Sequence, residues 1–347
     1  MPWRRFDGWP AAERWAPFRP VRLVSLGQVS RTPLPSFEGE VVVPAPGRGP
    51  GHWAGAASAV LDDDDGGVWL AYRLRRPVDD GRGVGVVVAR SADGVRFETV
   101  AQVGRDSFGA ASLERPAIVR RPDGGWRLYL SCATPGSKHW WVEALDADTP
   151  AALPVGSRTV VHEGSPELAV KDPVVLVDDE GWWMWLCCHP LDVPGHEDRM
   201  TTRLLRSDDG LAWADLGEVL RGTPGTWDAR GARVTAVLSR SPLVVLYDGR
   251  ATAGENWFER TGVARSLDGG AVLVADPGGP AASAPHGDGA LRYATVVPVP
   301  GGGLRWYAEV AHDDGSHDLV TSLSPDPGER PPAPSEEDTH AQGPTAR

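Results

Sequence analysis

A repeat that occurs five times along the chain constrains the fold more than any other feature. Each copy has a short apolar segment, a turn of Asp, Gly or Pro, and a second segment that carries Trp or Tyr. Apolar runs joined by such turns are typical of β-hairpins. The copies join residues 56–61 to 68–72, 117–120 to 126–130, 174–177 to 182–186, 234–238 to 243–247, and 293–297 to 304–308.

The spacing of the copies indicates more than isolated hairpins. The second segments begin near residues 69, 126, 182, 243 and 304, which gives steps of 57, 56, 61 and 61 residues. A regular step of that size fits a four-stranded propeller blade. No segment sustains an apolar period of 3.6 residues over about 12 residues, as an amphipathic helix would. We therefore predict an all-β fold, and more narrowly a five-bladed β-propeller.

A second, shorter motif supports this interpretation. The unit Ser-x-Asp-Gly begins at Ser91, Ser207 and Ser266, each time after a further apolar run. Asp and Gly at these places suit a tight turn between strands. We expect the motif to connect the outer strands of a blade.

One propeller domain is expected over residues 20–324. Residues 1–19 contain three tryptophans and are expected to pack as an aromatic N-terminal arm. Residues 325–347 contain six prolines and an acidic cluster, and are expected to form a disordered tail. The first residues are charged without a following apolar run, so we expect no secretory signal.

Charge and composition disfavour several classes of function. The chain has 47 Asp and Glu against 35 Lys and Arg, a formal net charge of −12 that would repel a nucleic-acid backbone. It has no apolar run near the roughly 20 residues that span a bilayer. Its three cysteines, Cys132, Cys187 and Cys188, are an odd number and argue against a disulfide framework. We expect a cytoplasmic protein that binds neither nucleic acid nor membrane.

Charged residues stand just before each predicted innermost strand. In a propeller these positions gather at one mouth of the central channel, on loops that a rigid scaffold positions. We expect Glu114, Asp172 and Asp228 to form a carboxylate cluster there, because glycoside hydrolysis needs a protonated acid and a base or nucleophile. Carboxylates that lie close together have pKa values that are pushed apart, so one of them could be the protonated acid and another the ionised base.

Basic, aromatic and polar side chains around these carboxylates are candidates for substrate binding. Arginine and lysine could hold sugar hydroxyls or an anionic group, and tryptophan could stack on a sugar face. Alternatively, the charges pair with one another and close the channel as an ion-pair network. The candidate binding residues are His52, Trp53, Arg115, Lys171, His189, Arg230, Asp248 and Arg292.

Four of these motifs together resemble five-bladed glycoside hydrolases: Glu114-Arg115-Pro116, Lys171-Asp172-Pro173, Trp227-Asp228 and Tyr247-Asp248-Gly249. Over about residues 50–323 the chain is similar to the family 43 superfamily and to the family 130 mannoside phosphorylases and hydrolases. The resemblance implies that Asp172 occupies the position of the family 43 aspartate that tunes the pKa of the acid. The Lys-Asp pair and the Trp227 to Gly249 segment look like the third and fourth blades of family 130.

Two departures from the family pattern matter for the chemistry. Residues 51–55, where family 43 members carry a base Asp, contain no carboxylate, although exo-galactanase-like members also lack it. The fourth blade offers Asp228 where an acid Glu would be expected. Similar propellers hold a calcium ion or a water in the channel, which would make His286 a candidate ligand. Otherwise we expect no metal or cofactor, because the loop with His189, His196 and Glu197 matches no zinc spacing.

The sequence therefore predicts a glycosidase that acts on a carbohydrate substrate, most simply with inversion. Asp228 is the expected acid, Glu114 the acid or base, and Asp172 the pKa modulator and sugar anchor. If phosphate replaces water, the enzyme is a glycoside phosphorylase. A propeller that binds a glycan or another protein without catalysis is the remaining alternative, favoured by the missing carboxylate of the first blade.

Overall fold

The computed structural model describes residues 34–267, 271–300 and 302–324, so the predicted N-terminal arm and C-terminal tail lie outside the described residues. Within these ranges the secondary structure is twenty β-strands and four short 3-10 helices. The all-β prediction is therefore confirmed, whereas the number of blades stays a prediction. The helices are η1 (Val78–Asp80), η2 (Arg105–Phe108), η3 (Pro150–Val155) and η4 (Ala253–Glu255).

Three of the predicted repeats form separate four-stranded sheets, in which consecutive strands pair antiparallel. Their order along the chain is also their order in the sheet, as in a meander. The first contains β6 (Ala117–Arg120), β7 (Trp126–Ala133), β8 (Trp140–Ala147) and β9 (Ser157–His162). The second contains β10 (Leu168–Asp178), β11 (Gly181–Pro190), β12 (Thr201–Ser207) and β13 (Ala214–Arg221). The third contains β14 (Gly231–Arg240), β15 (Leu243–Arg250), β16 (Arg260–Arg265) and β17 (Val274–Ala275).

The first and last repeats share one eight-stranded sheet. Its first-repeat strands are β2 (Trp53–Leu61), β3 (Val68–Arg75), β4 (Gly83–Ser91) and β5 (Glu98–Gly104). Its last-repeat strands are β18 (Leu291–Pro298), β19 (Leu304–Ala311) and β20 (His317–Ser324), with β1 (Glu40–Val43) paired to β20. The two halves meet through one parallel pair, Trp53 opposite His317.

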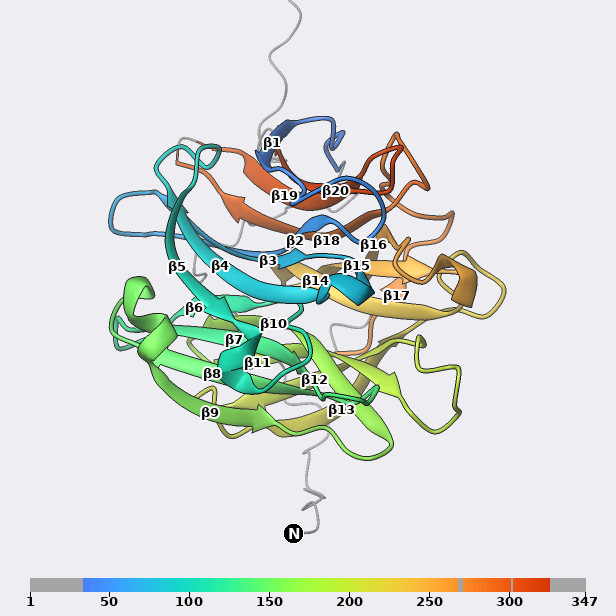
Figure 1. Ribbon diagram of the computed structural model, residues 1–347, viewed down its shortest axis with the longest axis horizontal. Coiled ribbons are helices and arrows are strands. Elements are labelled where there is room, and N and C mark those ends of the chain that lie inside the picture. Colours follow the sequence, from blue (N-terminus) through green and yellow to red (C-terminus); the bar gives the residue numbers. More distant parts are fainter. Residues whose placement is uncertain (1–33, 268–270, 301, 325–347) are drawn as a thin grey trace, which may run out of the picture.

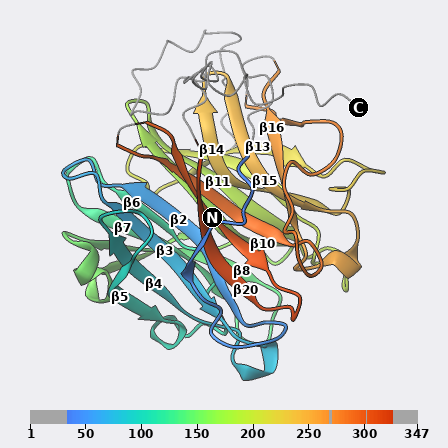
Figure 2. The same ribbon diagram turned by 90° about the horizontal axis from the view of Figure 1, so that it is seen from above.

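This connection brings the two ends of the described chain together. Figures 1 and 2 both show the blue strands β1 and β2 beside the red strand β20. Strand β1, which the repeat does not predict, adds a strand from the N-terminal side to the last repeat. The predicted single domain of residues 20–324 therefore has its described ends tied by strand pairing.

The Ser-x-Asp-Gly motif forms the expected turn where the structure describes it completely. In the β4–β5 turn the Ser91 Oγ accepts hydrogen bonds from the amides of Asp93 and Gly94. The β12–β13 turn repeats these bonds at Ser207. Glycine is required at the fourth position, because Gly94 has a φ of 73°, a left-handed conformation that side chains disfavour. The third copy extends into residues 268–270, outside the described residues.

The same turns also join neighbouring repeats. The Tyr307 hydroxyl of β19 donates a 2.8 Å hydrogen bond to the carbonyl of Gly94. The Tyr129 hydroxyl of β7 donates an equivalent 2.8 Å bond to the carbonyl of Gly210. A residue of one repeat thus holds the outer turn of the next, and the bond from Tyr307 links the last repeat to the first.

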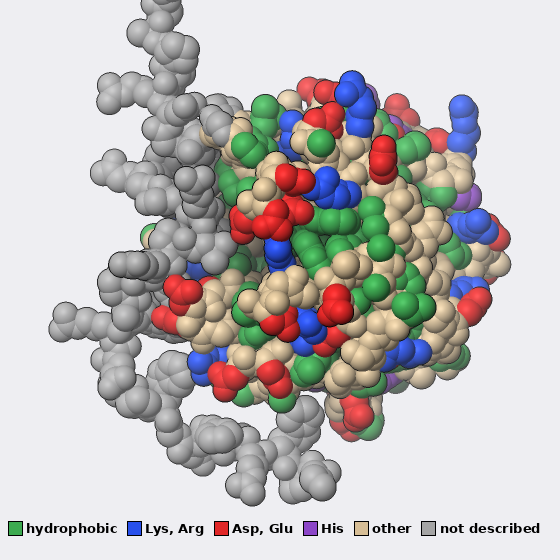
Figure 3. All heavy atoms as spheres, turned by 90° about the vertical axis from the view of Figure 1, so that its left-hand side faces the viewer, with side chains coloured by type: hydrophobic (Ala, Val, Ile, Leu, Met, Phe, Trp, Pro, Cys, Tyr) green, Lys and Arg blue, Asp and Glu red, His purple; other side chains and the backbone are tan. Residues whose placement is uncertain are grey.

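The apolar faces of the sheets pack against one another to form the core. One cluster contains Trp69, Val88 and Leu128, which come from β3, β4 and β7. Figure 3 shows acidic, basic and hydrophobic side chains interspersed on one face of the molecule. None of the helices in the described ranges has the length and apolar character needed to span a bilayer.

Candidate functional site at the inner-strand ends

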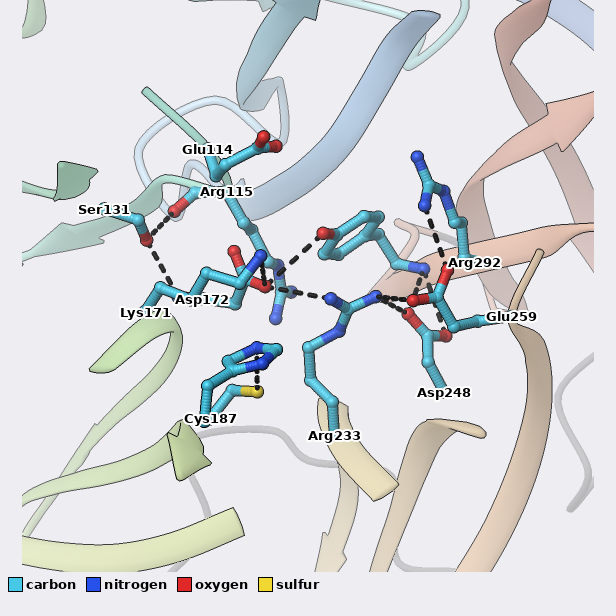
Figure 4. A network of polar contacts seen from close by, with 12 residues as sticks. Glu114, Arg115, Ser131, Lys171, Asp172, Cys187, Arg233, Asp248, Glu259 and Arg292 are labelled. Carbon is cyan, nitrogen blue, oxygen red and sulfur yellow. Dashed lines mark hydrogen bonds and ion pairs between the residues drawn. The ribbon is translucent and has the colours of Figure 1, made fainter. Parts of the chain in front are cut away.

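The predicted site residues lie where the inner strands begin and their hairpin partners end. Register pairs place Arg75 opposite Trp53, Arg73 opposite Gly55, and Glu309 opposite Arg292. Figure 4 shows the resulting network, in which charged side chains from several sheets point toward one another. The sequence predicted Glu114, Arg115, Lys171, Asp172, Asp248 and Arg292 of this network, but not its other members, such as Arg233 on β14 and Glu309 on β19.

Three inner strands contain a strained residue at equivalent positions. Ala56, Asp172 and Tyr293 have φ values of 53°, 54° and 54°. Each lies within an interruption of the antiparallel register, as in a β-bulge. Left-handed backbone costs a residue with a Cβ about 1–2 kcal/mol, and such strain clusters at functional sites. The bulges turn these strand starts so that Asp172 and Tyr293 meet inside the network.

Glu114 is held as an anion by several cations. Its Oε2 accepts a 2.6 Å hydrogen bond from Nε of Arg73, and its Oε1 lies 3.8 Å from Nε of Arg75. Burial would raise the pKa of Glu114, but Arg73, Lys171 and Arg75 outweigh it and hold this pKa well below its usual range. Its side chain is 5% exposed, the largest value among the five carboxylates of the network. Glu114 is therefore ionised at neutral pH. It can accept a proton as a base, or anchor a substrate by accepting hydrogen bonds, but it cannot donate a proton.

Asp172 is fully buried and shares the cations of two sheets. Its Oδ2 accepts a 2.9 Å bond from Arg233, and Nζ of Lys171 lies 3.4 Å away. Burial would raise the pKa of Asp172, yet Lys171 and Arg233 lower it below the usual value. Its Oδ1 is buried without a hydrogen-bond partner in the described part of the chain. An ionised carboxylate with a free oxygen beside Lys171 fits the predicted role of a modulator or anchor.

The side chain of Arg115 connects two inner strands by hydrogen bonds to their backbone carbonyls. Its guanidinium donates to the carbonyl of Thr235 at 2.6 Å and to that of Ala57 at 3.2 Å. It therefore connects β2 and β14, and in Figure 4 its side chain extends away from that of its neighbour Glu114. Burial lowers the pKa of Arg115 to about 10, so it remains a cation at neutral pH. Both described contacts are structural, and none of them requires a ligand.

Asp248 has the one raised pKa among the carboxylates of the network. Arg233 donates to its Oδ2 at 2.7 Å, and the Tyr293 amide donates at 3.0 Å. Burial raises the pKa of Asp248 to about 6, and Arg233 opposes the shift. Figure 4 shows Arg233 between Asp172 and Asp248, so one guanidinium joins the two carboxylates.

Arg292 completes the network on the last repeat. It donates to Glu309 at 2.7 Å and to Glu259 at 2.9 Å, and its guanidinium lies 4.3 Å from the ring of Trp53. Neighbouring carboxylates outweigh burial and raise the pKa of Arg292 above its usual value. The Nδ1 of His317 donates a 2.9 Å hydrogen bond to Glu309, and its ring stacks on Trp53 with ring centroids 4.7 Å apart. Trp53 is therefore a buried support for the network.

Asp228 and Arg230 make their described contacts elsewhere. Asp228 accepts hydrogen bonds from the Tyr247 hydroxyl at 2.9 Å and from the Thr226 hydroxyl, which organise its own loop. Arg230 makes a bidentate pair with Asp198 at 2.6 and 2.7 Å. No described contact joins either residue to Glu114 or Asp172, so their predicted roles stay predictions.

The two predicted histidines differ in how they are held. Burial lowers the pKa of His189 to about 3, so this ring is neutral; its Nδ1 donates a 2.9 Å bond to the Glu197 carbonyl. Its Nε2 lies 3.6 Å from the Sγ of Cys187. His52 is half-buried, and its Nδ1 has no hydrogen-bond partner in the described ranges. Burial raises the pKa of Cys187 to about 12, which leaves this thiol unreactive as a nucleophile.

The described residues contain no group of three or more His, Cys, Asp or Glu side chains placed to hold a metal ion. His286, the candidate calcium ligand, is 60% exposed and lies 3.9 Å from Asp313. Its described contact is therefore on the surface and not within the network. A calcium ion in the channel stays an untested expectation.

Seven members of the site were not predicted from the sequence: five lie inside strands, and two, Arg82 and Glu259, lie directly before one. The five extend the apolar runs of the repeats at the end nearest the network, where a charged residue usually indicates the end of a strand. A signal was present: alternate positions of β3 and β15 are charged at Arg73, Arg75, Asp248 and Arg250. The missed members are Arg73, Arg75, Arg82, Arg233, Arg250, Glu259 and Glu309.

Comparison with solved structures identifies the fold. An endo-arabinase from Bacteroides thetaiotaomicron superposes with a TM-score of 0.55 at 15% identity, covering 82% of this chain and 97% of that one. A thermostable family-43 glycoside hydrolase gives 0.62 at 12% identity, over 82% and 92% of the two chains. A β-1,2-mannobiose phosphorylase from Listeria innocua gives 0.56 at 14% identity, over 84% and 92%.

The chain has the fold of these glycoside-processing enzymes. No protein-family model and no curated protein matches it. The predicted resemblance to family 43-like and family 130-like propeller enzymes is therefore confirmed in three dimensions, at identities that establish the fold alone. What the residues of this chain do within that fold has to be inferred from its own site.

Proposed function

We propose that this protein is a glycoside-processing enzyme, and that its sheets close as five blades around the network of Figure 4. The observation that carries the proposal is the position of Glu114, an ionised and slightly accessible carboxylate at the strand ends of a glycosidase fold. Two half-buried groups, Lys171 and His52, lie at the same strand ends and are available to sugar hydroxyls.

In this proposal Glu114 acts as the base and Asp172 as the anchor and modulator. A base must be ionised at the working pH, and the cations around Glu114 favour that state; because they also lower its pKa far from the working pH, they weaken Glu114 as a base. Water activated by Glu114 would attack the anomeric carbon from the face opposite the leaving oxygen, which inverts the configuration. Asp228 remains the candidate acid from sequence, although both of its oxygens already accept hydrogen bonds from loop and core hydroxyls.

Phosphorolysis is the second candidate reaction. It is favoured by the cations around Glu114, which are Arg73, Arg75, Arg82 and Lys171; two of these, Arg75 and Arg82, have no other ion-pair partner among the described residues. Inorganic phosphate could bind to such a group and attack in place of water. A non-catalytic carbohydrate-binding protein is the outcome if no glycoside is turned over, since residues 51–55 carry no carboxylate.

The test is a screen of aryl glycosides and oligosaccharides, each with and without inorganic phosphate. We expect hydrolysis with inversion, read from the anomer that forms first in proton NMR. We expect Glu114→Gln to lower kcat by about 10²–10⁴-fold, the usual contribution of a general base. Asp228→Asn, measured in parallel, tests whether Asp228 is the acid or only holds its loop through hydrogen bonds.

Glu143→Gln is the matched control for Glu114→Gln. Both glutamates have side chains that are 5% exposed and hydrogen-bonded to an arginine, but Glu143 pairs with Arg158 away from the network. Unchanged kcat in Glu114→Gln, or equal losses in both variants, would overturn the assignment. Sugar affinity without turnover would support the binding protein, and turnover that requires phosphate would support the phosphorylase.

A further inference from the structure

Three guanidinium groups share the carboxylate of Glu114 at the edge of the network. Arg73 makes a 2.6 Å hydrogen bond to Oε2 of Glu114, while Arg75 and Arg82 both approach Oε1, at 3.8 and 3.7 Å. Arg73 has a second carboxylate partner in Glu309, at 3.1 Å. Among the described residues, Arg75 and Arg82 have no ion-pair partner other than this shared oxygen, at distances too long for a hydrogen bond.

Arg75 is a buried cation with unused donors. Its side chain is 2% exposed, and its Nη2 is buried with no hydrogen-bond partner in the described ranges. Its guanidinium lies 4.0 Å from the ring of Trp53 and 5.0 Å from that of Trp257. Leaving a buried donor unpaired costs about 1–3 kcal/mol, and more when it is charged. The unpaired donor of Arg75 is therefore able to donate a hydrogen bond to a ligand oxygen.

Two further cations lie near Glu114, as Arg75 does, and reach the surface. Arg82 is 32% exposed and Lys171 is 12% exposed. Their charged ends lie 5.2 and 5.0 Å from the ring of Trp140, which holds both near Glu114. Lys171 has Asp172 as its partner, but Asp172 also accepts from Arg233. The accessible side of the network is therefore cationic, within a chain of net charge −12.

We propose that Arg75, Arg82 and Lys171 bind a carboxylate carried by the substrate, so that the glycoside processed here is an acidic sugar. This inference rests on the proposed function, because it names the substrate class of the same site. A guanidinium presents a planar fork of donors that matches a carboxylate in bidentate geometry. Neutral hydroxyl groups would fill the donors but would leave the surplus charge uncompensated.

Trp257 supplies a surface for the sugar ring next to this anion site. It is 38% exposed, and its ring lies 5.9 Å from that of Trp53 in an edge-to-face arrangement. Its φ is 81°, a conformation that is rare for a bulky side chain and that clusters at ligand sites. A sugar ring stacked on Trp257 would carry its carboxylate toward the guanidinium of Arg75, 5.0 Å from the same indole.

The experiment compares sugars that differ only in this charge. The probes are methyl glucuronide against methyl glucoside, and methyl galacturonide against methyl galactoside, measured by isothermal titration calorimetry on the full chain. We expect the acidic member of at least one pair to bind about tenfold or more tightly, which corresponds to about 1.4 kcal/mol. That preference should shrink with added NaCl, because salt screens charges that are partly exposed to solvent.

Arg82→Gln is the main variant, because Arg82 is exposed enough to be replaced without unfolding. We expect it to lose about tenfold in affinity for the acidic sugar and little for the neutral one. Arg82→Lys, which keeps the charge, should recover part of the loss. The matched control is Arg90→Gln: Arg90 is 28% exposed and also lies over a tryptophan, 5.3 Å from the ring of Trp69, but pairs with Asp65 elsewhere.

Separate results overturn this inference and the proposed function. Equal affinity for the acidic and neutral members of both pairs, or equal losses in Arg82→Gln and Arg90→Gln, would overturn the acidic-sugar inference even if glycosides are cleaved. Inorganic phosphate or sulfate binding at Arg82, with no uronide preference, would assign the cations to a free oxyanion and also overturn it. A uronide preference without turnover would support it while removing the enzymatic proposal.

Discussion

Replacing Arg233 with methionine is the change that most directly tests the buried network. Its guanidinium donates to Asp172 at 2.9 Å and to Asp248 at 2.7 Å, and both carboxylates have side chains with no exposed surface. Removing one partner of a buried ion pair costs about 3–5 kcal/mol, because a charge is left uncompensated. Lys171 still faces Asp172 at 3.4 Å, and the Tyr293 amide still donates to Asp248. We therefore expect a loss near the lower end, about 3 kcal/mol.

The measurement is urea unfolding followed by tryptophan fluorescence at pH 7. Arg203→Met is the control, because Arg203 forms a bidentate pair with Asp215 in which the side chains are 33% and 29% exposed. Pairs exposed to this extent contribute about 0–1 kcal/mol. The free energy of unfolding should therefore fall several times further in Arg233→Met than in Arg203→Met.

Two further measurements separate electrostatics from loss of packing. Arg233 opposes the raised pKa of Asp248, so without Arg233 this carboxyl should take up a proton more readily. The variant should then regain stability between pH 7 and pH 5, and the double variant Arg233→Met, Asp248→Asn should be more stable than the single one. If Arg233→Met costs no more than Arg203→Met, or if Asp248→Asn adds a full further loss, the ion-pair reasoning is wrong.

Two other predictions concern pH and the repeated turns. Burial raises the pKa of Asp248 from 3.8 to about 6, so the stability that its protonated form contributes is present below about pH 4 and is lost as pH rises from about 4 to about 6. Glu114, where neighbouring cations outweigh burial and lower the pKa from 4.5, contributes stability that is lost as pH falls below about 4.5. The melting temperature, measured from pH 8 to pH 3, should therefore be highest at about pH 4, and a flat profile in Asp248→Asn and wild type alike would contradict this. Ser91→Ala should cost about 1 kcal/mol in urea unfolding, because its Oγ accepts the Gly94 amide; Ser207→Ala should match it, and no loss in either variant would refute the turn's role.

The strands of the repeat could be predicted closely from sequence because their signals are local. The second segments were expected to begin at residues 68, 126, 182, 243 and 304, and β3, β7, β11, β15 and β19 begin within one residue of these positions. Apolar alternation and turn residues act over a few neighbouring positions, so they can be recognised without knowing the partners of a strand.

The ends of the same strands were harder to predict. The second segment of the first copy was expected to end at Tyr72, but β3 continues to Arg75; that of the fourth was expected to end at Tyr247, but β15 continues to Arg250. These extensions carry buried arginines, and a charged residue normally indicates exposure. Their burial is compensated by carboxylates from other parts of the chain, such as Glu309 for Arg73 and Glu259 for Arg250.

The predicted site residues divide into two groups by their contacts, while their roles stay predictions. Glu114 and Asp172 both lie near the cation of Lys171, as expected for residues at neighbouring strand starts. Asp228 stands at the corresponding place in the sequence, yet its described bonds go to Tyr247 and to its own loop. The position of a residue in the sequence predicts that it lies at a strand start. The direction of its side chain depends on the local bulge and on the neighbouring sheet.

The all-β character, the repeat and its turns follow from the amino-acid sequence alone, because hydrogen-bonded strands and tight turns depend on residues close in the chain. Which charges meet depends on the folded arrangement: Arg73 contacts Glu309 across 236 residues and Asp172 contacts Arg233 across 61. Such pairs form only when different repeats bring their strand ends together, and burial and neighbouring charges then set whether each group is ionised. The cationic edge at Arg75 and Arg82 is a property of that assembly, which no single segment of the chain contains.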